Sequence, residues 1–406
     1  MSRNNPLRVL LVHNSYRQPG GEDRVFSTEA DLLRDRGHQV FTYTRHNPHQ
    51  DGASLVNVAA RAVWNQGVYV HLRRLIRQTK PDVVHVHNTF PLISPAAYYA
   101  ARREGVATVQ TLHNYRLLCT NGLLFREGRP CEDCLHRSVP WPGVVHACYR
   151  HSYAASLAAG GTVAAHWAAG TWTSQVDRYI ALTEFARQKF IAGGIDPERV
   201  AVKANVIHPD PAIGAGGGRY ALFVGRLSPE KGIHTLVRAW SRLRGRVRLV
   251  VVGDGPLAPI VERAVAENDS IEWLGYREPE QVNELIGRAT CVVVPSLWYE
   301  TFGLVVAEAF AKGTPVVVTR LGALAELVQH QRTGMHFTPD DPDDLAKQVE
   351  WVFEHPIEVA RMRREARTEY ERRYSVESNY PVLCRIYAEA IGARRATSAA
   401  NAARPG

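Results

Sequence analysis

The feature that most constrains the fold is a repeated alternation of short β-branched apolar runs with longer amphipathic stretches. The runs are LRVLLVHN, QVFTYTR, DVVHVHN, ATVQTLHN, DRYIALTE, YALFVGRL, VRLVVVGDG, IEWLGY, TCVVVPS and TPVVVTR. Segments with helical periodicity, such as EDRVFSTEADLLRDRG and GIHTLVRAWSRL, lie between them. Strands that are apolar on both faces and separated by helices are typical of parallel sheets with helices on each side. The pattern therefore predicts an α/β fold.

The alternation breaks once, at HPDPAIGAGGGR, whose proline and glycine content is typical of a linker. We therefore predict two doubly wound Rossmann-like domains facing across a cleft. The expected divisions are a first domain over 1–207 with a cysteine-bearing insert at 114–151, a linker at 208–219, a second domain over 220–374, a helix over 375–396 that packs back on the first domain, and a disordered tail at 397–406.

Composition narrows the class of protein. No stretch reaches the roughly 18 apolar residues of a membrane span, and the N-terminus lacks the pattern of a signal peptide, so we expect a cytoplasmic protein. Residues 1–200 carry 23 Lys and Arg against 15 Asp and Glu, within a net charge of +9. This excess indicates a phosphate-bearing substrate, an anionic lipid surface, or a solvated basic face without a partner. No recognition-helix, RNA-platform or zinc-finger pattern accompanies it, so we expect no nucleic acid.

Ligands of open α/β sheets bind beyond the carboxyl ends of the strands. After the first strand, Gly20 and Gly21 precede a helical pattern, where unpaired backbone N–H groups can hold a phosphate. Glycines that simply join a strand to a helix are the alternative. The spacing is not G-x-G-x-x-G, which argues against a dinucleotide-dependent oxidoreductase.

The first strand of the second domain leads into VGRLSPEKGIHTL. Arg226 and Lys231 lie on its loop, beside a predicted helix start. An arginine fork and a lysine point charge together suit a diphosphate. The alternative is a solvated loop in which these cations pair with Glu230. In VVVGDGP, Gly253 and Gly255 allow a backbone to approach a ligand closely or form a tight turn.

The segment YETFGLVVAEAFAKGTP carries two glutamates around an apolar run. If the helix begins near Phe302, Glu300 precedes its N-terminus and Glu308 lies about one and a half turns inside it. Glu300 can then accept hydrogen bonds from ligand hydroxyls, and Glu308 suits a second polar group. The backbone N–H groups that would face the ligand between them belong to Phe302, Gly303 and Leu304.

The strings GRLSPEKG, VGDGP, ETFGLVVAE and GTPVV occur in this order, and together they resemble the nucleotide-sugar domain of family 4 retaining glycosyltransferases, which have the GT-B fold. The resemblance implies a nucleoside-diphosphate sugar held mainly by the second domain. It implies that Glu300 binds hydroxyls of the donor sugar, Glu308 the ribose, and Arg226 and Lys231 the diphosphate. It also implies that Gly21 approaches the phosphates from the first domain.

In the first domain, ATVQTLHNYRLLC places His113 after an apolar strand. Family members have a histidine here, close to the donor sugar; a structural hydrogen bond is the alternative. Asn114 and Arg116 are candidates for contacts with the acceptor. His85 and His87 share one face of the strand in DVVHVHN, where packing is the alternative to chemistry, and His87 lies nearer the strand end.

The family implies a mechanism with no obligatory protein nucleophile, in which the acceptor hydroxyl attacks from the leaving-group side and the departing phosphate takes its proton. Arg226 and Lys231 then stabilise the leaving group in place of a metal, and no cofactor is required. The D-x-D of Asp341-Pro342-Asp343 reads as a helix start with Asp341 as its cap, not as a metal site. The alternatives are a nucleotide-sugar epimerase, hydrolase or phosphorylase, and a non-catalytic glycan-binding scaffold.

Four cysteines lie in the insert with the spacing C-x11-C-x2-C-x13-C, namely Cys119, Cys131, Cys134 and Cys148. Structural zinc or an iron–sulfur cluster is one interpretation, with His136, His146 or His151 as substitute ligands. A single C-x2-C argues against a zinc ribbon. The insert resembles that of bacterial polysaccharide-assembly relatives, which favours a glycan or lipid-linked acceptor.

The stretch RAVWNQGVYVHLRRLIRQTK, residues 61–80, combines aromatic, aliphatic and basic residues at helical spacing. Such a helix either packs on its own sheet or rests on anionic lipid at the inner face of a membrane.

Overall fold

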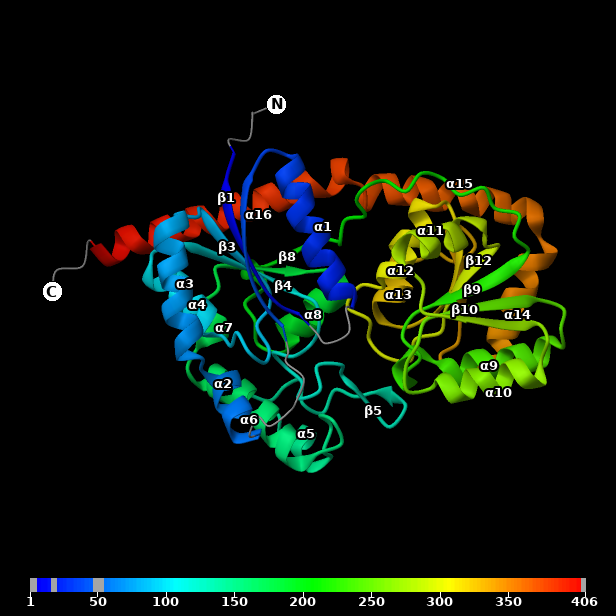
Figure 1. The fold of residues 1–406 in the computed structure, drawn as a ribbon, viewed down its shortest axis with the longest axis horizontal. Helices are drawn as coiled ribbons and strands as arrows, with labels where there is room; N and C mark the ends of the chain where they lie inside the picture. The colour runs from blue at the N-terminus through cyan, green and yellow to red at the C-terminus, as the bar shows by residue number, and fades with distance from the viewer. Residues whose placement is uncertain (1–5, 16–19, 47–54, 403–406) are drawn as a thin grey trace. The chain divides into compact units, whose positions relative to one another are not determined.

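The computed structural model describes residues 6–15, 20–46 and 55–402, which divide into two compact units (Figure 1). The first unit comprises residues 1–124, 132–206 and 379–406, and the second comprises residues 125–131 and 207–378. Each unit contains one sheet of six parallel strands flanked by helices, so the predicted pair of doubly wound α/β domains is confirmed.

The sheet of the first unit has the strand order β2-β1-β3-β4-β7-β8. All six strands are parallel. After β1 the chain adds β2 on one side, and it then adds β3 and all later strands on the other side, so the strand order reverses between β1 and β3. The strands are β1 (Arg8–Ser15), β2 (Gln39–His46), β3 (Val83–Asn88), β4 (Ala107–Leu112), β7 (Arg178–Ala181) and β8 (Val200–Val202). Every residue of β3 and β4 is buried, including the polar side chains that alternate with apolar ones along both strands.

Helices cover this sheet, and the core beneath them includes Phe26 and Leu33 of α1 and Ile386 and Tyr387 of α16. The helices are α1 (Gly21–Asp35), α2 (Leu55–Val63), α3 (Gln66–Thr79), α4 (Ala96–Arg103), α5 (Trp141–Val145), α6 (Tyr153–Ala168), α7 (Thr171–Ser174), α8 (Glu184–Ala192), the 3-10 turn η1 (Pro197–Arg199) and α16 (Val376–Ala402).

The sheet of the second unit has the order β11-β10-β9-β12-β13-β14, with its reversal between β9 and β12. The strands are β9 (Tyr220–Val224), β10 (Arg248–Val252), β11 (Ile271–Gly275), β12 (Cys291–Val294), β13 (Val316–Thr319) and β14 (Gly334–Phe337). This is the 3-2-1-4-5-6 order of nucleotide-binding Rossmann sheets.

The helices of the second unit are η2 (Pro229–Lys231), α9 (Ile233–Leu243), α10 (Ala258–Glu267), α11 (Pro279–Arg288), α12 (Leu304–Ala311), α13 (Gly322–Leu327), α14 (Pro342–Glu354) and α15 (Pro356–Arg373). Trp240 of α9 is fully buried, and its indole N–H donates to the carbonyl of Val247 at 2.9 Å. Asp341 caps α14, accepting from the backbone N–H groups of Asp343 and Asp344, so the prediction of a helix cap is confirmed.

The sequence pattern did not predict two edge strands, β8 and β14, or the hairpin of β5 (Phe125–Arg126) and β6 (Arg129–Pro130). β5, β6 and β8 have two or three residues, too few for a recognisable run, and β14, GMHF, contains no β-branched residue. The hairpin lies in the second unit, although its flanking residues belong to the first.

The basic segment 61–80 forms two helices rather than one, because Asn65 caps α3 by accepting from the N–H of Val68. Leu72 and Ile76 are buried. Arg73 and Arg77 both donate to Glu104, whereas Arg61, Arg74 and Lys80 are exposed. The buried face of α3 packs on its own unit, and the rest of the segment remains on the surface.

The C-terminal helix extends further than expected. We predicted disorder from Thr397, but α16 continues to Ala402; residues 403–406 lie outside the described ones. Alanine has the highest helix propensity, and the small residues of this tail continue the helix. Arg394 fastens it to the first unit through two contacts of 2.6 and 2.7 Å with the buried carboxylate of Asp177.

Candidate functional site

The carboxyl ends of β9 and β12 meet where the strand order of the second sheet reverses. In open α/β sheets this is the place where a crevice for ligands forms. The loop after β9 carries Arg226 and Lys231, and the loop after β12 carries Ser296, Trp298 and Glu300. The topology thus brings together two loops that the sequence places far apart.

Lys231 and Glu300 form an ion pair, with Nζ 2.6 Å from Oε1. The same carboxylate oxygen accepts a hydrogen bond of 2.8 Å from the hydroxyl of Ser296. The ammonium also lies 5.3 Å from the centre of the Trp298 ring, in range of a cation–π interaction. Glu300 is buried, whereas the lysine side chain is 27% exposed, so Lys231 retains a face toward solvent.

The alternative pairing with Glu230 is wrong for Lys231. The Glu230 carboxylate instead accepts from the Ser228 hydroxyl at 2.6 Å, and its backbone carbonyl accepts from the N–H of Leu297. Arg226 is exposed and forms no ion pair within the described part of the chain. Because no carboxylate of the described residues neutralises its charge, Arg226 can bind an anion without first breaking an internal ion pair.

Gly253 and Gly255 allow two loops to pack against each other. A Cβ added at Gly253 would lie 1.9 Å from the carbonyl oxygen of Gly225, and one at Gly255 would lie 2.5 Å from that of Leu227. Both residues have positive φ angles, +128° and +158°. The structure thus gives both glycines a role in loop packing, which does not depend on a ligand.

Helix α12 begins at Leu304, two residues later than predicted. Gly303 precedes it with φ +90°, a conformation that glycine adopts without strain. Phe302 is buried with its ring 5.7 Å from that of Tyr374, so it anchors the turn. Glu300 precedes the helix and the buried Glu308 lies inside it, as predicted, although the later start leaves Glu308 only about one turn inside.

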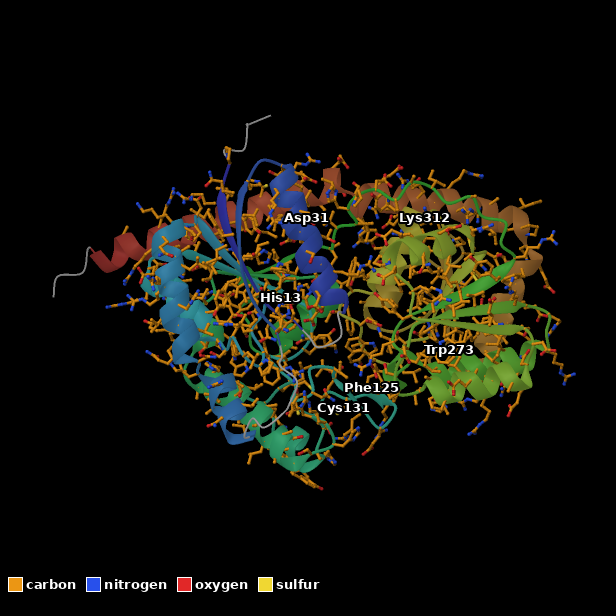
Figure 2. The ribbon with its side chains drawn as sticks, viewed as in Figure 1. His13, Asp31, Phe125, Cys131, Trp273 and Lys312 are labelled. Carbon is orange, nitrogen blue, oxygen red and sulfur yellow. The ribbon has the colours of Figure 1, made fainter. Side chains whose placement is uncertain are left out.

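In the first unit, the sheet reverses between β1 and β3. His13 lies near the end of β1 (Figure 2), with Nε2 3.0 Å from Oδ1 of Asp23. The other oxygen of Asp23 accepts from the backbone N–H of Gly20 at 2.8 Å, and Gly20 is the N-cap residue of α1. Gly21 is exposed as the first helical residue. Residues 16–19 of this loop lie outside the described ones.

A chain of buried side chains connects β3, β4, α1 and β8. His113 Nε2 lies 3.0 Å from His87 Nδ1, and His87 Nε2 lies 3.4 Å from Oε1 of Glu29. The other oxygen of Glu29 accepts from Nζ of Lys203 at 3.1 Å. His85 also contacts Glu29, with its Nδ1 2.9 Å from Glu29 Oε1. All five side chains are at most 8% exposed.

Burial determines the charges of this network. It lowers the pKa of His87 to about 4, and it lowers the pKa of His113 well below the usual value, with the neighbouring histidines adding to the effect. Burial also raises the pKa of Glu29, but the attraction of Lys203 and His85 outweighs this and holds that pKa well below its usual value. Near pH 7, Glu29 is therefore ionised while His87 and His113 are neutral.

These charges assign the tautomers. The Glu29 carboxylate can only accept, so the proton of His87 lies on Nε2, and His87 Nδ1 is an acceptor. His113 must then carry its proton on Nε2, facing His87. Its Nδ1 is left as the acceptor nitrogen. The chain from Glu29 to His113 thus orients a neutral imidazole at the carboxyl end of β4.

Among the described residues, Glu29, His85 and His87 are the one group of three potential metal ligands whose donor atoms all lie within 4.8 Å of one another. Lys203 already supplies a positive charge to this carboxylate. His85 also lies 2.8 Å from the hydroxyls of both Tyr387 and Thr111. The three side chains thus form a buried, charge-paired network, in which Glu29 Oε1 and His87 Nε2 lack a hydrogen bond of ordinary geometry.

The cysteines of the insert form no such group within the described residues. Cys134 is buried and lies 3.9 Å from the carbonyl of Pro140, and Cys119 donates to Asn121 at 3.0 Å. Cys131 lies in the second unit, whereas Cys119, Cys134 and Cys148 lie in the first. The interpretation of a four-cysteine zinc or iron–sulfur site therefore finds no support in the structure.

Asn114 and Arg116 hold the insert. Asn114 Nδ2 donates to Glu22 at 2.7 Å, and its Oδ1 accepts from the N–H of Arg116. The Arg116 guanidinium lies 4.5 Å from the centre of the Phe90 ring and 5.0 Å from that of Tyr149. It also donates to the carbonyl of residue 120. This guanidinium is committed to internal contacts, which argues against its predicted role in binding an acceptor.

Sequence reasoning missed Glu29, Lys203 and Ser296. Glu29 was detectable as a charged residue on the buried face of an otherwise apolar helix stripe, and Lys203 as a lysine directly after an apolar strand. Neither signal identifies the partner, because 174 positions separate the two residues.

Two family models match this chain. "Glycosyltransferase Family 4" matches residues 19–210 and "Glycosyl transferases group 1" matches residues 218–355. The curated relatives that match most strongly are covered over only about a third to three fifths of their own length.

Several relatives match over most of this chain. A D-inositol 3-phosphate glycosyltransferase of Mycobacteroides abscessus is 29% identical, over 84% of this chain and 81% of its own. An uncharacterised 42.6 kDa protein in the cps region of Klebsiella pneumoniae is 24% identical, over 79% of this chain and 87% of its own.

Among solved structures, HepE of Anabaena in complex with UDP is similar with a TM-score of 0.65 and 19% identity, over 93% of this chain and 98% of that one. The same protein was also solved with UDP-glucose. At this level of identity the likeness shows the GT-B fold.

Proposed function

Because the chain belongs to the family 4 glycosyltransferases, we propose that it is a retaining glycosyltransferase. It moves a sugar from a nucleoside-diphosphate sugar to a hydroxyl group of a glycan or lipid-linked acceptor. The observation that carries this proposal is the Lys231–Glu300 pair at the reversal point of the second sheet. Such a point is where Rossmann sheets bind nucleotides.

The second unit holds the donor. Lys231 and the exposed Arg226 bind the diphosphate, and they stabilise the charge that develops when the glycosidic bond to phosphate breaks. Glu300 holds Lys231 in place through Oε1, and it accepts hydrogen bonds from hydroxyls of the donor sugar. Glu308 binds the ribose, and the turn of Phe302, Gly303 and Leu304 supports the middle of the ligand.

Retention follows from attack by the acceptor hydroxyl on the face that the leaving phosphate vacates. The phosphate takes the proton of this hydroxyl, so no protein nucleophile or metal is needed. The protein contributes orientation and charge stabilisation. In the first unit, the family resemblance assigns His113 to the donor sugar and Gly21 to the phosphates, and Gly20 shares the glycine turn at the start of α1. His87 does not contact the donor in this proposal; it orients His113 through the contact between their ring nitrogens.

The donor and acceptor classes rest on different observations. HepE was solved with UDP and with UDP-glucose, which supports UDP-sugars as the first donors to test. The resemblance of the insert to those of polysaccharide-assembly relatives supports a role in cell-surface polysaccharide assembly. An acceptor carried on lipid would require peripheral contact with a membrane. No helix within the described ranges is long and apolar enough to cross a bilayer.

The experiment is a thermal-shift screen of nucleotide sugars, followed by product analysis with lipid extracts as acceptors. We expect one nucleotide sugar to stabilise the fold and to give a product whose anomeric configuration, read by NMR, matches that of the donor. Nucleotide release that needs no acceptor would instead indicate an epimerase or hydrolase. Failure of the folded protein to bind any nucleotide sugar would overturn the proposal.

A further inference from the structure

The large apolar side chains that remain exposed are concentrated in one segment of the first unit. Ten such side chains are exposed within the described residues, and five of them lie between positions 139 and 157. These are Val139, Trp141, Val145, Tyr153 and Leu157, with 50–68% of each residue's surface exposed. Isolated exposed hydrophobic residues are ordinary, but a cluster of this kind marks an interaction surface.

Helix α6 is apolar on both of its faces. Its sequence, YAASLAAGGTVAAHWA, contains no Asp, Glu, Lys or Arg. Ala159 and Val163 are buried against the unit, whereas Tyr153, Leu157 and Ala165, spaced by four and eight residues, line one exposed face. A helix that is apolar all round is normally buried on all sides. The exposed face of α6 therefore lacks the cover that its composition requires.

The charged side chains between Asp133 and Asp177 all have one sign. No Asp or Glu occurs between Asp133 and Asp177, and the two charged residues in that interval, Arg137 and Arg150, are both exposed. The Arg137 guanidinium lies 5.1 Å from the centre of the Trp141 ring. Arginine beside an aromatic ring at the edge of an apolar patch is the arrangement that suits lipid headgroups over acyl chains.

The neighbouring elements extend the surface. Helix α2 packs against α6, and Trp64 follows directly after α2 with 38% of its surface exposed. Figure 1 shows α2, α5 and α6 together at one end of the first unit. We define the α5–α6 surface by Val139, Trp141, Val145, Tyr153 and Leu157, with Arg137 and Arg150 at its rim.

We propose that the α5–α6 surface rests on an anionic lipid bilayer. The aromatic and aliphatic side chains enter the interface, and the two arginines contact anionic headgroups. This inference rests on the proposed function and deepens its membrane contact. It centres that contact on the insert and α6, with Trp64 of the basic segment 61–80 extending the surface.

A second copy of the chain is a poorer occupant. In a two-fold symmetric dimer the same patch faces itself, so the arginines of one copy would face a segment whose only charged side chains are also arginines. No acidic residue of the segment could neutralise them. A bilayer with acidic headgroups offers both the apolar interior and the opposite charge.

The test is sedimentation with vesicles of phosphatidylcholine alone and of phosphatidylcholine mixed with phosphatidylglycerol, without any sugar nucleotide. We expect the full-length protein to bind the mixed vesicles. The variant Trp141→Glu/Leu157→Glu should lose binding by about 100-fold, because two apolar anchors become charges that repel the surface. The variant Arg137→Gln/Arg150→Gln should lose most of its preference for the mixed vesicles, by roughly fivefold per arginine.

The matched control is Tyr276→Glu/Ile357→Glu, which places the same charges at two exposed apolar positions of the second unit. It should bind vesicles as the wild type does, and all variants should keep the wild-type melting temperature. Equal binding by the Trp141→Glu/Leu157→Glu variant, or no binding by the wild type, would overturn the inference. A wild-type dimer in light scattering that this variant dissociates would show that a second copy is the occupant. Because no donor is present, a failed sugar-transfer assay leaves this result unaffected.

Discussion

Nζ of Lys231 lies 2.6 Å from Oε1 of Glu300, although 69 positions separate the two residues along the chain. The contact exists because β9 and β12 are neighbours in the sheet, so the loops that leave their carboxyl ends meet. Lys231 is therefore held at the point where we expect the nucleotide to bind. The Glu300 carboxylate balances its positive charge.

Removing either partner of this pair should nearly abolish sugar transfer. We expect Lys231→Ala and Glu300→Ala each to lower kcat/KM by at least about 100-fold, because charge stabilisation of the leaving diphosphate is lost or misplaced. Steady-state kinetics measures this, with circular dichroism to verify folding. Lys347→Ala, at an exposed position of the same unit, is the control and should retain wild-type kinetics. Unimpaired turnover in both site variants would refute the assignment.

Arg226 should act mainly on binding of the donor. We expect Arg226→Ala to raise the Kd of the nucleotide sugar by roughly 10–100-fold, since a charge-assisted contact with phosphate is worth about 1.5–3 kcal/mol. Titration calorimetry at two salt concentrations should show a weaker salt dependence in the variant. Arg263→Ala, an exposed arginine on α10, should change neither quantity.

The buried Glu29–Lys203 pair should behave as a unit. Either Glu29→Gln or Lys203→Met alone leaves a charge buried without its partner, so we expect each to lower the free energy of unfolding by about 3–5 kcal/mol. The double variant should lose clearly less than the sum of the two, which a double-mutant cycle in urea measures. Strict additivity would show that the two charges do not interact.

The buried histidines should make the fold sensitive to acid. Their pKa values are lower in the folded state than in the unfolded state, so the unfolded chain takes up protons first as the pH falls below about 6.5. Stability is thus full above that pH and is lost toward pH 4, at up to about 1.4 kcal/mol per pH unit for each histidine. Urea melts of His87→Gln should show a shallower decline between pH 7 and 5. Loss of the exposed His234 in His234→Gln should leave the slope unchanged.

Gly253 should tolerate no side chain. In Gly253→Ala the new Cβ would lie 1.9 Å from a backbone oxygen, so the loops after β9 and β10 must separate, and both stability and donor binding should fall. Gly245→Ala is the control, because Gly245 has φ +81° but no atom within 4 Å of the added Cβ. It should cost only the strain of the left-handed conformation, roughly 1 kcal/mol, with normal donor binding.

Local patterns in the sequence were sufficient for most of the fold. The β-branched runs correspond to ten of the twelve strands of the two sheets, because β-branched and aromatic residues favour the extended conformation. The order of short motifs also indicated the family and placed Glu300 before a helix and Glu308 within it. Two edge strands were missed, because β8 has only three residues and β14, GMHF, contains no β-branched residue.

The tertiary structure alone decided which side chains meet. Strand order places Lys231 beside Glu300 rather than its sequence neighbour Glu230, and it joins Glu29 with Lys203 and His87 in one buried network. It also leaves one face of α6 exposed, although the composition of that helix would suit an interior. Periodicity reports how each segment divides between core and surface, whereas charge pairing and exposed patches depend on which segments the sheet topology makes neighbours.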